Sequence, residues 1–249
     1  MRITIFHTND LHNRFYPLDY LETLSRNSHT LILDAGDAIG GSNTVFRFRE
    51  PILDKMSAIG YDAMAIGNRE FNYLRSVIEG RVSQVNFPLL CSNVVDLKGI
   101  INSLILPYII KNIDGAKIAL IGFTPVQFRE KSIWKKLTGF QFLEPAEAAL
   151  KVISRIKDKV HLIIALSHLG LKDDEKLARE IPEINLIIGG HSHTTLKNFV
   201  RAGNTFIFQT GCYGNYLGKI DIEFNAENIP AKIKDVRSLL IPVKEKDEK

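Results

Sequence analysis

Side chains that can bind metal ions follow five of the short apolar runs of this sequence. In chain order they are Asp10, His12, Asp37, Asn68, His168, His191 and His193. Carboxylate, amide and imidazole groups without thiolates suit Zn, Mn, Fe, Ni or Co, and they do not suit Ca. If one carboxylate is shared, seven such ligands fill two metal positions and leave room for water and a substrate. The set therefore predicts a centre of two divalent transition metal ions.

Each of these signals is weak when it is taken alone. An Asp-x-His pair is usually a surface turn, and a lone histidine such as His168 is often a hydrogen-bonded core residue. His191 and His193 could likewise be a chance pair in a loop. Their common position argues against coincidence, because the carboxyl ends of strands in an open α/β sheet meet at the crevice where sites form.

The elements that must position these residues can be read from hydrophobic patterning. Short β-branched runs predict strands at residues 3–7, 31–33, 63–66, 88–91, 117–122, 162–166 and 186–188. Helical patterns lie between them, at residues 18–26, 51–59, 70–78, 145–157 and 173–179. This alternation predicts an α/β fold in which helices pack on a largely parallel sheet.

The remaining strands follow another pattern. Residues 108–113 and 117–122, separated by Asp114-Gly115, predict a hairpin. Residues 205–209, 219–224 and 232–242 predict strands without helices between them, which implies a second sheet or an antiparallel edge, and hence a two-sheet sandwich. We expect a single domain over residues 1–243 and a charged tail at residues 244–249.

Composition limits the possible functions. The 249 residues are 45% hydrophobic and 24% charged, so a sizeable core can form. A net charge of +4 is too small and too scattered to predict a nucleic acid or a membrane as partner. The amino terminus has no apolar segment of the signal-peptide type, and no apolar run could span a membrane, so we expect a cytoplasmic protein. The sequence predicts no oligomeric state.

Five ordered blocks resemble the calcineurin-like metallophosphoesterases: H-T-N-D-L-H, G-D-A-I-G-G-S, G-N-R-E-F, S-H-L-G and G-G-H-S-H-T. The first block, and Q-T-G-C-Y-G-N-Y-L-G further on, are most similar to the 5'-nucleotidase branch. The resemblance covers roughly residues 2–226. It implies a four-layer α/β/β/α sandwich of two mixed sheets flanked by helices. It also implies a metal-dependent hydrolase that acts on a small phosphomonoester or phosphodiester.

The resemblance also implies a role for each ligand. One ion would be held by Asp10, His12, Asp37 and His193, and the second by Asn68, His168 and His191, with Asp37 bridging the two ions. Asn43, which follows two glycines and a serine, could reach a phosphate oxygen or could serve only the turn.

Two positions depart from the family pattern. The metal-binding Asn of the family is typically followed by His, and in the nucleotidase branch an Asp three residues later supports that imidazole. This chain has Arg69 and Asn72 there. An arginine stays charged and cannot act as a general acid, but it can place a positive fork beside a phosphate. We therefore expect Arg69 and Asn72 at the catalytic position, with Arg69 also contacting the substrate.

Three functions remain open from the sequence. The first is a phosphoesterase, whose turnover the Arg69 and Asn72 departure could reduce. The second is a degenerate relative that binds metal and phosphate-bearing ligands as a sensor or a subunit. The third, an interaction module, predicts no metal at all. The motifs leave no room for the nucleotide-recognition domain of full-length 5'-nucleotidases, so we expect nucleoside monophosphates to be poor substrates.

Overall fold

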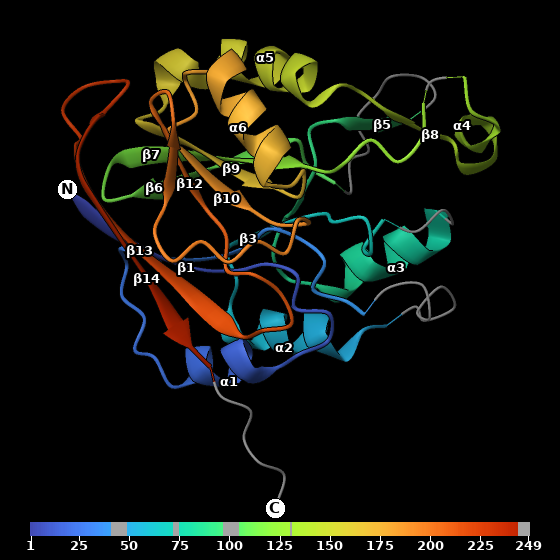
Figure 1. Ribbon diagram of the computed structural model, residues 1–249, viewed down its shortest axis with the longest axis horizontal. Helices are drawn as coiled ribbons and strands as arrows, with labels where there is room; N and C mark the ends of the chain where they lie inside the picture. The colour runs from blue at the N-terminus through green and yellow to red at the C-terminus, as the bar shows by residue number, and fades with distance from the viewer. Residues whose placement is uncertain (41–48, 72–74, 97–104, 130, 244–249) are drawn as a thin grey trace, which may run out of the picture.

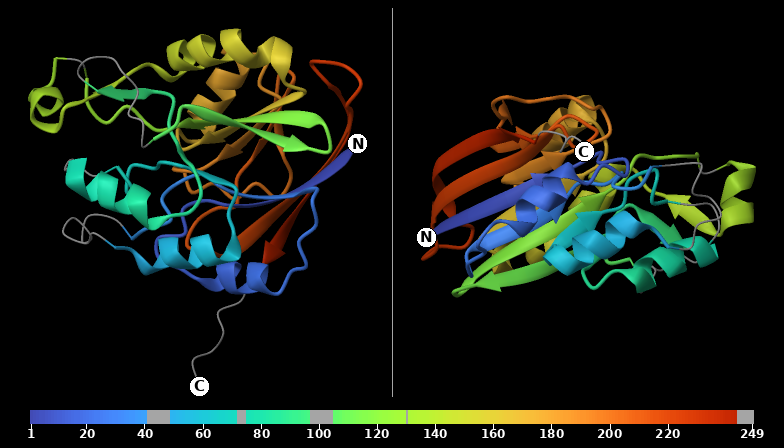
Figure 2. Two further views of the ribbon diagram at one scale, coloured as in Figure 1. Left: turned by 180° about the vertical axis from the view of Figure 1, so that it is seen from behind. Right: turned by 90° about the horizontal axis from the view of Figure 1, so that it is seen from below.

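The computed structural model describes the chain except for residues 41–48, 72–74, 97–104, 130 and 244–249. Two large sheets pack face to face, and helices cover their outer faces (Figures 1 and 2). The expected four-layer α/β/β/α architecture is therefore confirmed. None of the helices in the described part of the chain is long and apolar enough to cross a membrane.

The first sheet has six strands in the order β14-β13-β1-β2-β3-β4. Four of them run parallel: β1 (Arg2–Thr8), β2 (Thr30–Asp34), β3 (Ala63–Ala65) and β4 (Leu89–Leu90). Two late strands, β13 (Tyr216–Asn225) and β14 (Lys232–Pro242), add an antiparallel edge. The expected antiparallel edge is thus confirmed, and it extends the sheet that begins with β1.

The second sheet also has six strands, in the order β11-β12-β10-β9-β7-β6. Its parallel strands are β7 (Ala116–Phe123), β9 (Leu162–Ser167), β10 (Leu186–Gly189) and β12 (Thr205–Phe208). The antiparallel edge strands are β6 (Tyr108–Ile113) and β11 (Val200–Ala202). The predicted hairpin is confirmed, because β6 and β7 are joined at Asp114 and Gly115, both with positive φ.

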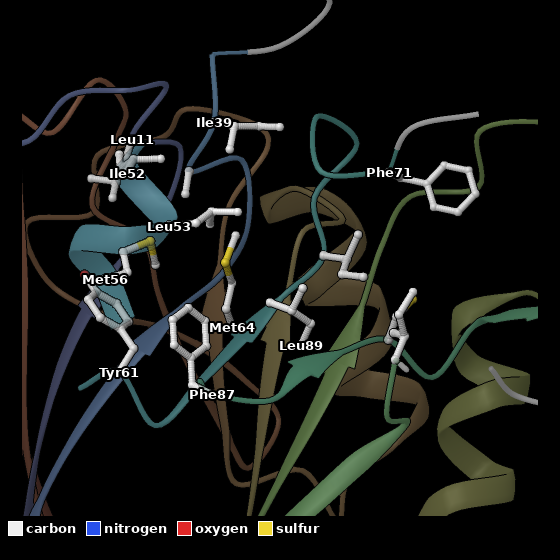
Figure 3. Close-up of a cluster of buried hydrophobic side chains, with 14 of the residues drawn as sticks. Leu11, Ile39, Ile52, Leu53, Met56, Tyr61, Met64, Phe71, Phe87 and Leu89 are labelled. Atoms are coloured by element: carbon white, nitrogen blue, oxygen red, sulfur yellow. The ribbon is translucent and has the colours of Figure 1, made fainter. Parts of the chain in front are cut away.

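Helices from the first third of the chain cover the first sheet. They are α1 (Tyr16–Glu22), α2 (Pro51–Ile59) and α3 (Arg75–Gln84). α2 matches its predicted bounds, because a proline starts it and Gly60, with φ +84°, ends it. Its Leu53 and Met56 pack with Met64 of β3 in a buried cluster (Figure 3).

The other two layers form in the same way. α5 (Pro145–Ile156) and α6 (Leu171–Glu180) cover the second sheet, where Ile153 and Leu177 join a cluster with Ile163 of β9. A short 3₁₀ turn, η2 (Lys157–Lys159), follows α5. Between the sheets, Ile5 of β1 and Leu120 of β7 belong to a third buried cluster. Alternation along β1 sends its odd-numbered residues into this inner layer.

Two parts of the chain differ from the sequence prediction. A helix was expected at residues 70–78, but Glu70 lies in a turn and is buried, with its carboxylate bound to backbone N–H groups, and the described helix α3 covers Arg75–Gln84. The ribbon β5 (Val94–Asp96) with β8 (Phe140–Phe142), and the helix α4 (Ile133–Thr138) before β8, were not predicted. They form an arm beyond the two main sheets (Figure 1).

Candidate metal centre

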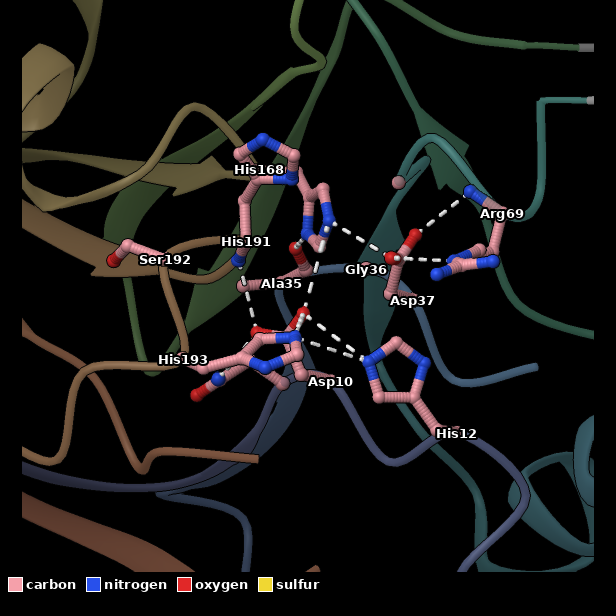
Figure 4. A network of polar contacts seen from close by, with 12 residues as sticks. Asp10, His12, Ala35, Gly36, Asp37, Arg69, His168, His191, Ser192 and His193 are labelled. Carbon is pink, nitrogen blue, oxygen red and sulfur yellow. Dashed lines mark hydrogen bonds and ion pairs between the residues drawn. The ribbon is translucent and has the colours of Figure 1, made fainter. Parts of the chain in front are cut away.

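Loops from both sheets bring six of the seven predicted ligands to one place (Figure 4). The seventh, Asn68, precedes Arg69, whose backbone N–H donates to Asp37. Asp10 and Asp37 come from the loops after β1 and β2, in the first sheet. His168 and His193 follow β9 and β10, in the second sheet. The sheets place these groups together because the carboxyl ends of their central parallel strands open on the same edge.

One group of possible ligand atoms joins Asp10, His12 and His193. The Oδ1 atom of Asp10 lies 3.4 Å from Nε2 of His193 and 3.8 Å from Nε2 of His12. The two imidazole Nε2 atoms are 3.2 Å apart. Three donor atoms this close can share one cation.

A second group joins Asp10, Asp37 and His168. Nε2 of His168 lies 3.3 Å from Oδ2 of Asp37 and 3.8 Å from Oδ1 of Asp10. Nδ1 of the same ring faces the carbonyl oxygen of Ala35 at 2.8 Å and donates to it. This hydrogen bond turns Nε2 toward the two carboxylates, as is common for a histidine that binds a metal.

Asp10 contributes to both groups, whereas Asp37 contributes to one. The implied bridging role of Asp37 therefore stays a prediction. His191 lies beside the second group: its ring centroid is 5.2 Å from that of His168, and its backbone N–H donates to Oδ2 of Asp10 at 2.9 Å. The ring of His191 is in neither group, so its predicted role as a ligand stays a prediction.

The donor set fits divalent cations, because several of its buried polar atoms have no hydrogen-bond partner among the described residues. Oδ1 of Asp10, Oδ1 of Asn68 and Nε2 of His168 are buried, and none has a hydrogen-bond partner among the described residues. A buried polar atom without a partner costs about 1–3 kcal/mol, so native proteins rarely leave several together. A divalent ion would satisfy Oδ1 of Asp10 and Nε2 of His168 together, because these two atoms lie 3.8 Å apart.

The charges at the centre also fit a divalent cation. Burial alone would lower the pKa of His168, but contact with Asp37 and the charge of Asp10 raise it to about 9. Burial opposes ionisation of Asp37 as well, yet His168 and the N–H of Arg69 lower the pKa of that carboxyl. The two carboxylates thus favour positive charge at this point of the site, as a bound divalent cation would supply.

The backbone at the centre is strained. Asp10, His12, Asp37, His191 and His193 all have φ between 47° and 70°, a region that non-glycine residues seldom occupy. Each such residue costs of order 1–3 kcal/mol and persists only where the surroundings impose it. Strain of this kind concentrated in predicted ligands is typical of a functional site.

Gly67 has a separate reason to be small. A Cβ atom there would lie 2.2 Å from Oδ1 of Asp37 and 2.4 Å from its backbone nitrogen. The loop that carries Asn68 can therefore approach the loop of Asp37 only because residue 67 has no side chain.

Sequence reasoning missed two buried charges that hold these loops. Glu70 is 3% exposed and accepts hydrogen bonds from the backbone N–H groups of Gly67, Asp37 and Ile39. Arg81 of α3 is 1% exposed, and its Nη1 donates to the carbonyl oxygens of Glu70 at 2.9 Å and Arg69 at 3.2 Å. Glu70 stands in the G-N-R-E-F block, which was the available signal; nothing in the pattern around Arg81 marks it.

A tyrosine at the edge of the centre was also missed. Tyr213 is 50% exposed, and its ring centroid lies 5.2 Å from that of His12 and 5.7 Å from that of His193. Its backbone N–H donates to the carbonyl oxygen of Asp10 at 2.8 Å. Tyr213 thus borders the first ligand group on the solvent side.

The predicted catalytic and substrate positions are only partly described. Arg69 is exposed; its backbone N–H donates to Oδ1 of Asp37 at 2.8 Å, and its Nε lies 3.7 Å from Oδ2. The side chain therefore stands beside the second ligand group (Figure 4). Asn43 and Asn72 lie outside the described residues, so their predicted roles stay predictions.

Residues 3–195 match the family model described as Calcineurin-like phosphoesterase. The chain belongs to the calcineurin-like phosphoesterase family. Among curated relatives of this phosphoesterase chain, a 5'-nucleotidase of Vibrio cholerae is 34% identical over 90% of the chain and 49% of the relative. A trifunctional nucleotide phosphoesterase of Bacillus subtilis, YfkN, is 30% identical over 99% of the chain and 20% of the relative. The chain thus spans about half or less of these relatives.

Solved structures support the same fold. A 5'-nucleotidase precursor from Thermus thermophilus superposes with a TM-score of 0.80 at 24% identity, covering 98% of this chain and 55% of that one. The calcineurin-like phosphoesterase YfkN structure from Bacillus subtilis gives a TM-score of 0.81 at 24% identity, covering 97% and 91%. The expected resemblance to 5'-nucleotidases is confirmed over most of the chain, and the solved structures confirm the fold.

Proposed function

We propose that this calcineurin-like phosphoesterase hydrolyses a small phosphomonoester or phosphodiester with two divalent transition metal ions. The observation that carries the proposal is the convergence of Asp10, Asp37 and His168, whose ligand atoms lie within 4.8 Å of one another, while Oδ1 of Asp10 and Nε2 of His168 have no hydrogen-bond partner among the described residues. When bound, such ions would lower the pKa of a water molecule and neutralise charge on phosphoryl oxygens. The ions would be Mn, Zn, Fe, Ni or Co, because the donors are oxygen and imidazole nitrogen.

The predicted ligands would be shared between the two ions. Asp10, His12, Asp37 and His193 would hold one ion, and Asp37, Asn68, His168 and His191 the other. The positive-φ backbones of five of them and the Glu70 carboxylate would fix the donors before any ligand arrives; the five are Asp10, His12, Asp37, His191 and His193. A site that needs no reorganisation stabilises developing charge more effectively.

Arg69 would bind the phosphate. Its exposed guanidinium stands beside Asp37, so it can reach an anion that bridges the ligand groups. A fixed positive fork favours the charge that spreads over the phosphoryl oxygens during transfer. Arg69 cannot donate a proton to the leaving oxygen, and we therefore expect the enzyme to favour acidic leaving groups.

A second candidate function has one observation in its favour. The Arg69 and Asn72 departure removes the pair that in related enzymes supplies and supports an imidazole. A protein that binds metal and phosphate ligands without useful turnover would tolerate that loss. The unaltered ligand set supports hydrolysis, because a binding protein has less need for two ions.

The experiment that tests hydrolysis begins with metal analysis of the purified protein. The apoprotein is then loaded with Mn, Ni, Co or Zn and assayed with nitrophenyl phosphate, bis-nitrophenyl phosphate, alkyl phosphates and AMP. We expect turnover with at least one ion, fastest on nitrophenyl esters, and little on AMP. Asp37→Asn is the matched inactive variant. If the fully metallated chain is inert on every ester, the binding function replaces the enzyme.

A further inference from the structure

The arm that carries α4 extends beyond the two sheets. α4 lies at an outer end of the molecule in Figure 1 and in both views of Figure 2. Behind α4, Phe140 and Phe142 of β8 pack against Phe71, with ring centroids 5.1 and 5.0 Å apart. Phe71 follows Arg69 by two residues, so the base of the arm adjoins the candidate metal centre while α4 stands clear of it.

α4 shows its apolar face to the solvent. Ile133 is 68% exposed, Leu137 67% and Trp134 50%, and Thr138 is the buried residue of the helix. At about 100° per residue, positions 133, 134 and 137 lie within one face of a helix. A surface helix normally turns such a face to the core, so this helix has the opposite orientation. Single exposed apolar residues are ordinary, whereas three together at a tip indicate an interaction surface.

Basic residues surround this face. Residues 129–137 read R-E-K-S-I-W-K-K-L, with four basic residues and one acidic residue. Arg129, Lys131 and Lys136 are exposed in the structure. The combination of exposed Trp, Ile and Leu with Lys and Arg is typical of segments that lie in the interface of an anionic bilayer. The overall charge of the chain gives no sign of this, because the feature is local.

We propose that α4 docks on an anionic lipid surface, with Ile133, Trp134 and Leu137 entering the interface and Lys131 and Lys136 meeting the headgroups. Charge complementarity selects this occupant, because a second copy of the chain would bring the same positive charge. Three side chains of one six-residue helix also fall far below the roughly 800 Å² per partner that a stable dimer buries. Docking would attach the molecule to the bilayer surface through the arm that carries α4.

The sequence offers a direct probe, because Trp134 is its only tryptophan. The metal-free protein is titrated with vesicles of phosphatidylcholine alone and of phosphatidylcholine with phosphatidylglycerol. We expect the emission maximum of Trp134 to move to shorter wavelength with the anionic vesicles, with quenching by brominated acyl chains. High salt should reverse the shift, because the attraction to headgroups is screened. Unchanged emission with anionic vesicles would overturn the proposal.

Variants separate the two parts of the surface. Ile133→Ser with Leu137→Ser should abolish vesicle sedimentation, and Lys131→Glu with Lys136→Glu should weaken it by about tenfold or more. The matched controls are Leu150→Ser, an equally apolar position 56% exposed on α5, and Lys232→Glu with Lys234→Glu on β14, which should bind as wild type. Equal binding of neutral and anionic vesicles would contradict the charge argument. So would a dimer in sedimentation velocity that Leu137→Ser dissociates, because the occupant would then be a second copy.

Discussion

Glu70 holds the backbone of Asp37, because its Oε2 accepts the Asp37 N–H at 2.8 Å. The same oxygen accepts the N–H of Gly67 at 2.9 Å, and Oε1 accepts that of Ile39 at 3.1 Å. Gly67 precedes the predicted ligand Asn68. One buried carboxylate therefore fixes two ligand loops that come from different strands.

The substitution Glu70→Gln tests whether these hydrogen bonds hold the two ligand loops in place. The amide nitrogen of the glutamine would face backbone N–H groups, leaving at least one of them without an acceptor. We expect the free energy of unfolding to fall by about 1–3 kcal/mol and ion affinity to fall by about 10–100-fold. Urea denaturation of the metal-free protein and competition with a chelator measure the two effects. Glu147→Gln, at an exposed position of α5, is the control; wild-type affinity in Glu70→Gln would contradict the assignment.

The number of ions retained by ligand variants identifies the bridging carboxylate. If Asp37 is shared by both ions, Asp37→Asn should retain less than one ion per chain, whereas His191→Gln should retain about one. Native mass spectrometry together with elemental analysis gives these counts. Loss of both ions in Asp10→Asn, with one ion kept in Asp37→Asn, would show that Asp10 is the shared ligand, as its place in both donor groups also allows.

Substitutions of Arg69 should change the dependence of rate on the leaving group. Arg69→Ala should lower the rate of hydrolysis of every ester, because a charge-assisted contact to phosphate is lost. Arg69→His should recover activity on alkyl phosphates, whose basic leaving oxygen needs a proton, by up to about 10²–10⁴-fold when Asn72→Asp supports the new ring. A plot of log kcat against leaving-group pKa should flatten in the double variant. An equally steep plot would place residue 69 away from the leaving oxygen.

Asp174 predicts how stability depends on pH. Burial raises the pKa of this carboxyl from 3.8 to about 8, although Oγ of Ser167 donates a hydrogen bond to it. The native state keeps the proton to about pH 8, whereas the unfolded chain loses it near pH 4, so unfolding releases the proton between these values. The contribution to stability is therefore full below pH 4 and is lost as the pH rises to about 8.

Asp174→Asn should remove this dependence, since an amide has no proton to lose. Relative to wild type, the variant should gain on the order of 4 kcal/mol between pH 5 and pH 8. Urea denaturation in EDTA measures the difference without interference from metal. The exposed neighbour provides the control, because Asp173→Asn should show no such trend. Parallel stability curves for Asp174→Asn and wild type would refute the prediction.

Much of the fold could be predicted because β-branched runs are local signals. The strands ending before Asp10, Asp37, His168 and His191 were all expected, and the site follows from their carboxyl ends meeting. The sequence also showed a departure at Arg69. Which neighbours contact that arginine depends on how the loops pack, and patterning does not carry that information.

The missed features are those that tertiary contacts decide. The pattern at residues 70–78 favours a helix, but the turn at Glu70 is stabilised by N–H groups more than thirty residues away. Arg81 reads as a solvated residue of a polar helix and is instead 1% exposed beneath the ligand loop. α4 was missed because its six residues are too few for a helical hydrophobic period to stand out in the sequence.

The division of the ligands between two sheets has a kinetic consequence. Asp10 and Asp37 belong to strands of one sheet, and His168 to a strand of the other, more than 130 residues later in the chain. A folding intermediate with only one sheet formed would lack half of the donors and could not bind the ions. The ions would then stabilise only conformations in which the two sheets have already docked. Bound ions would therefore lower the unfolding rate of the sandwich and leave its folding rate unchanged.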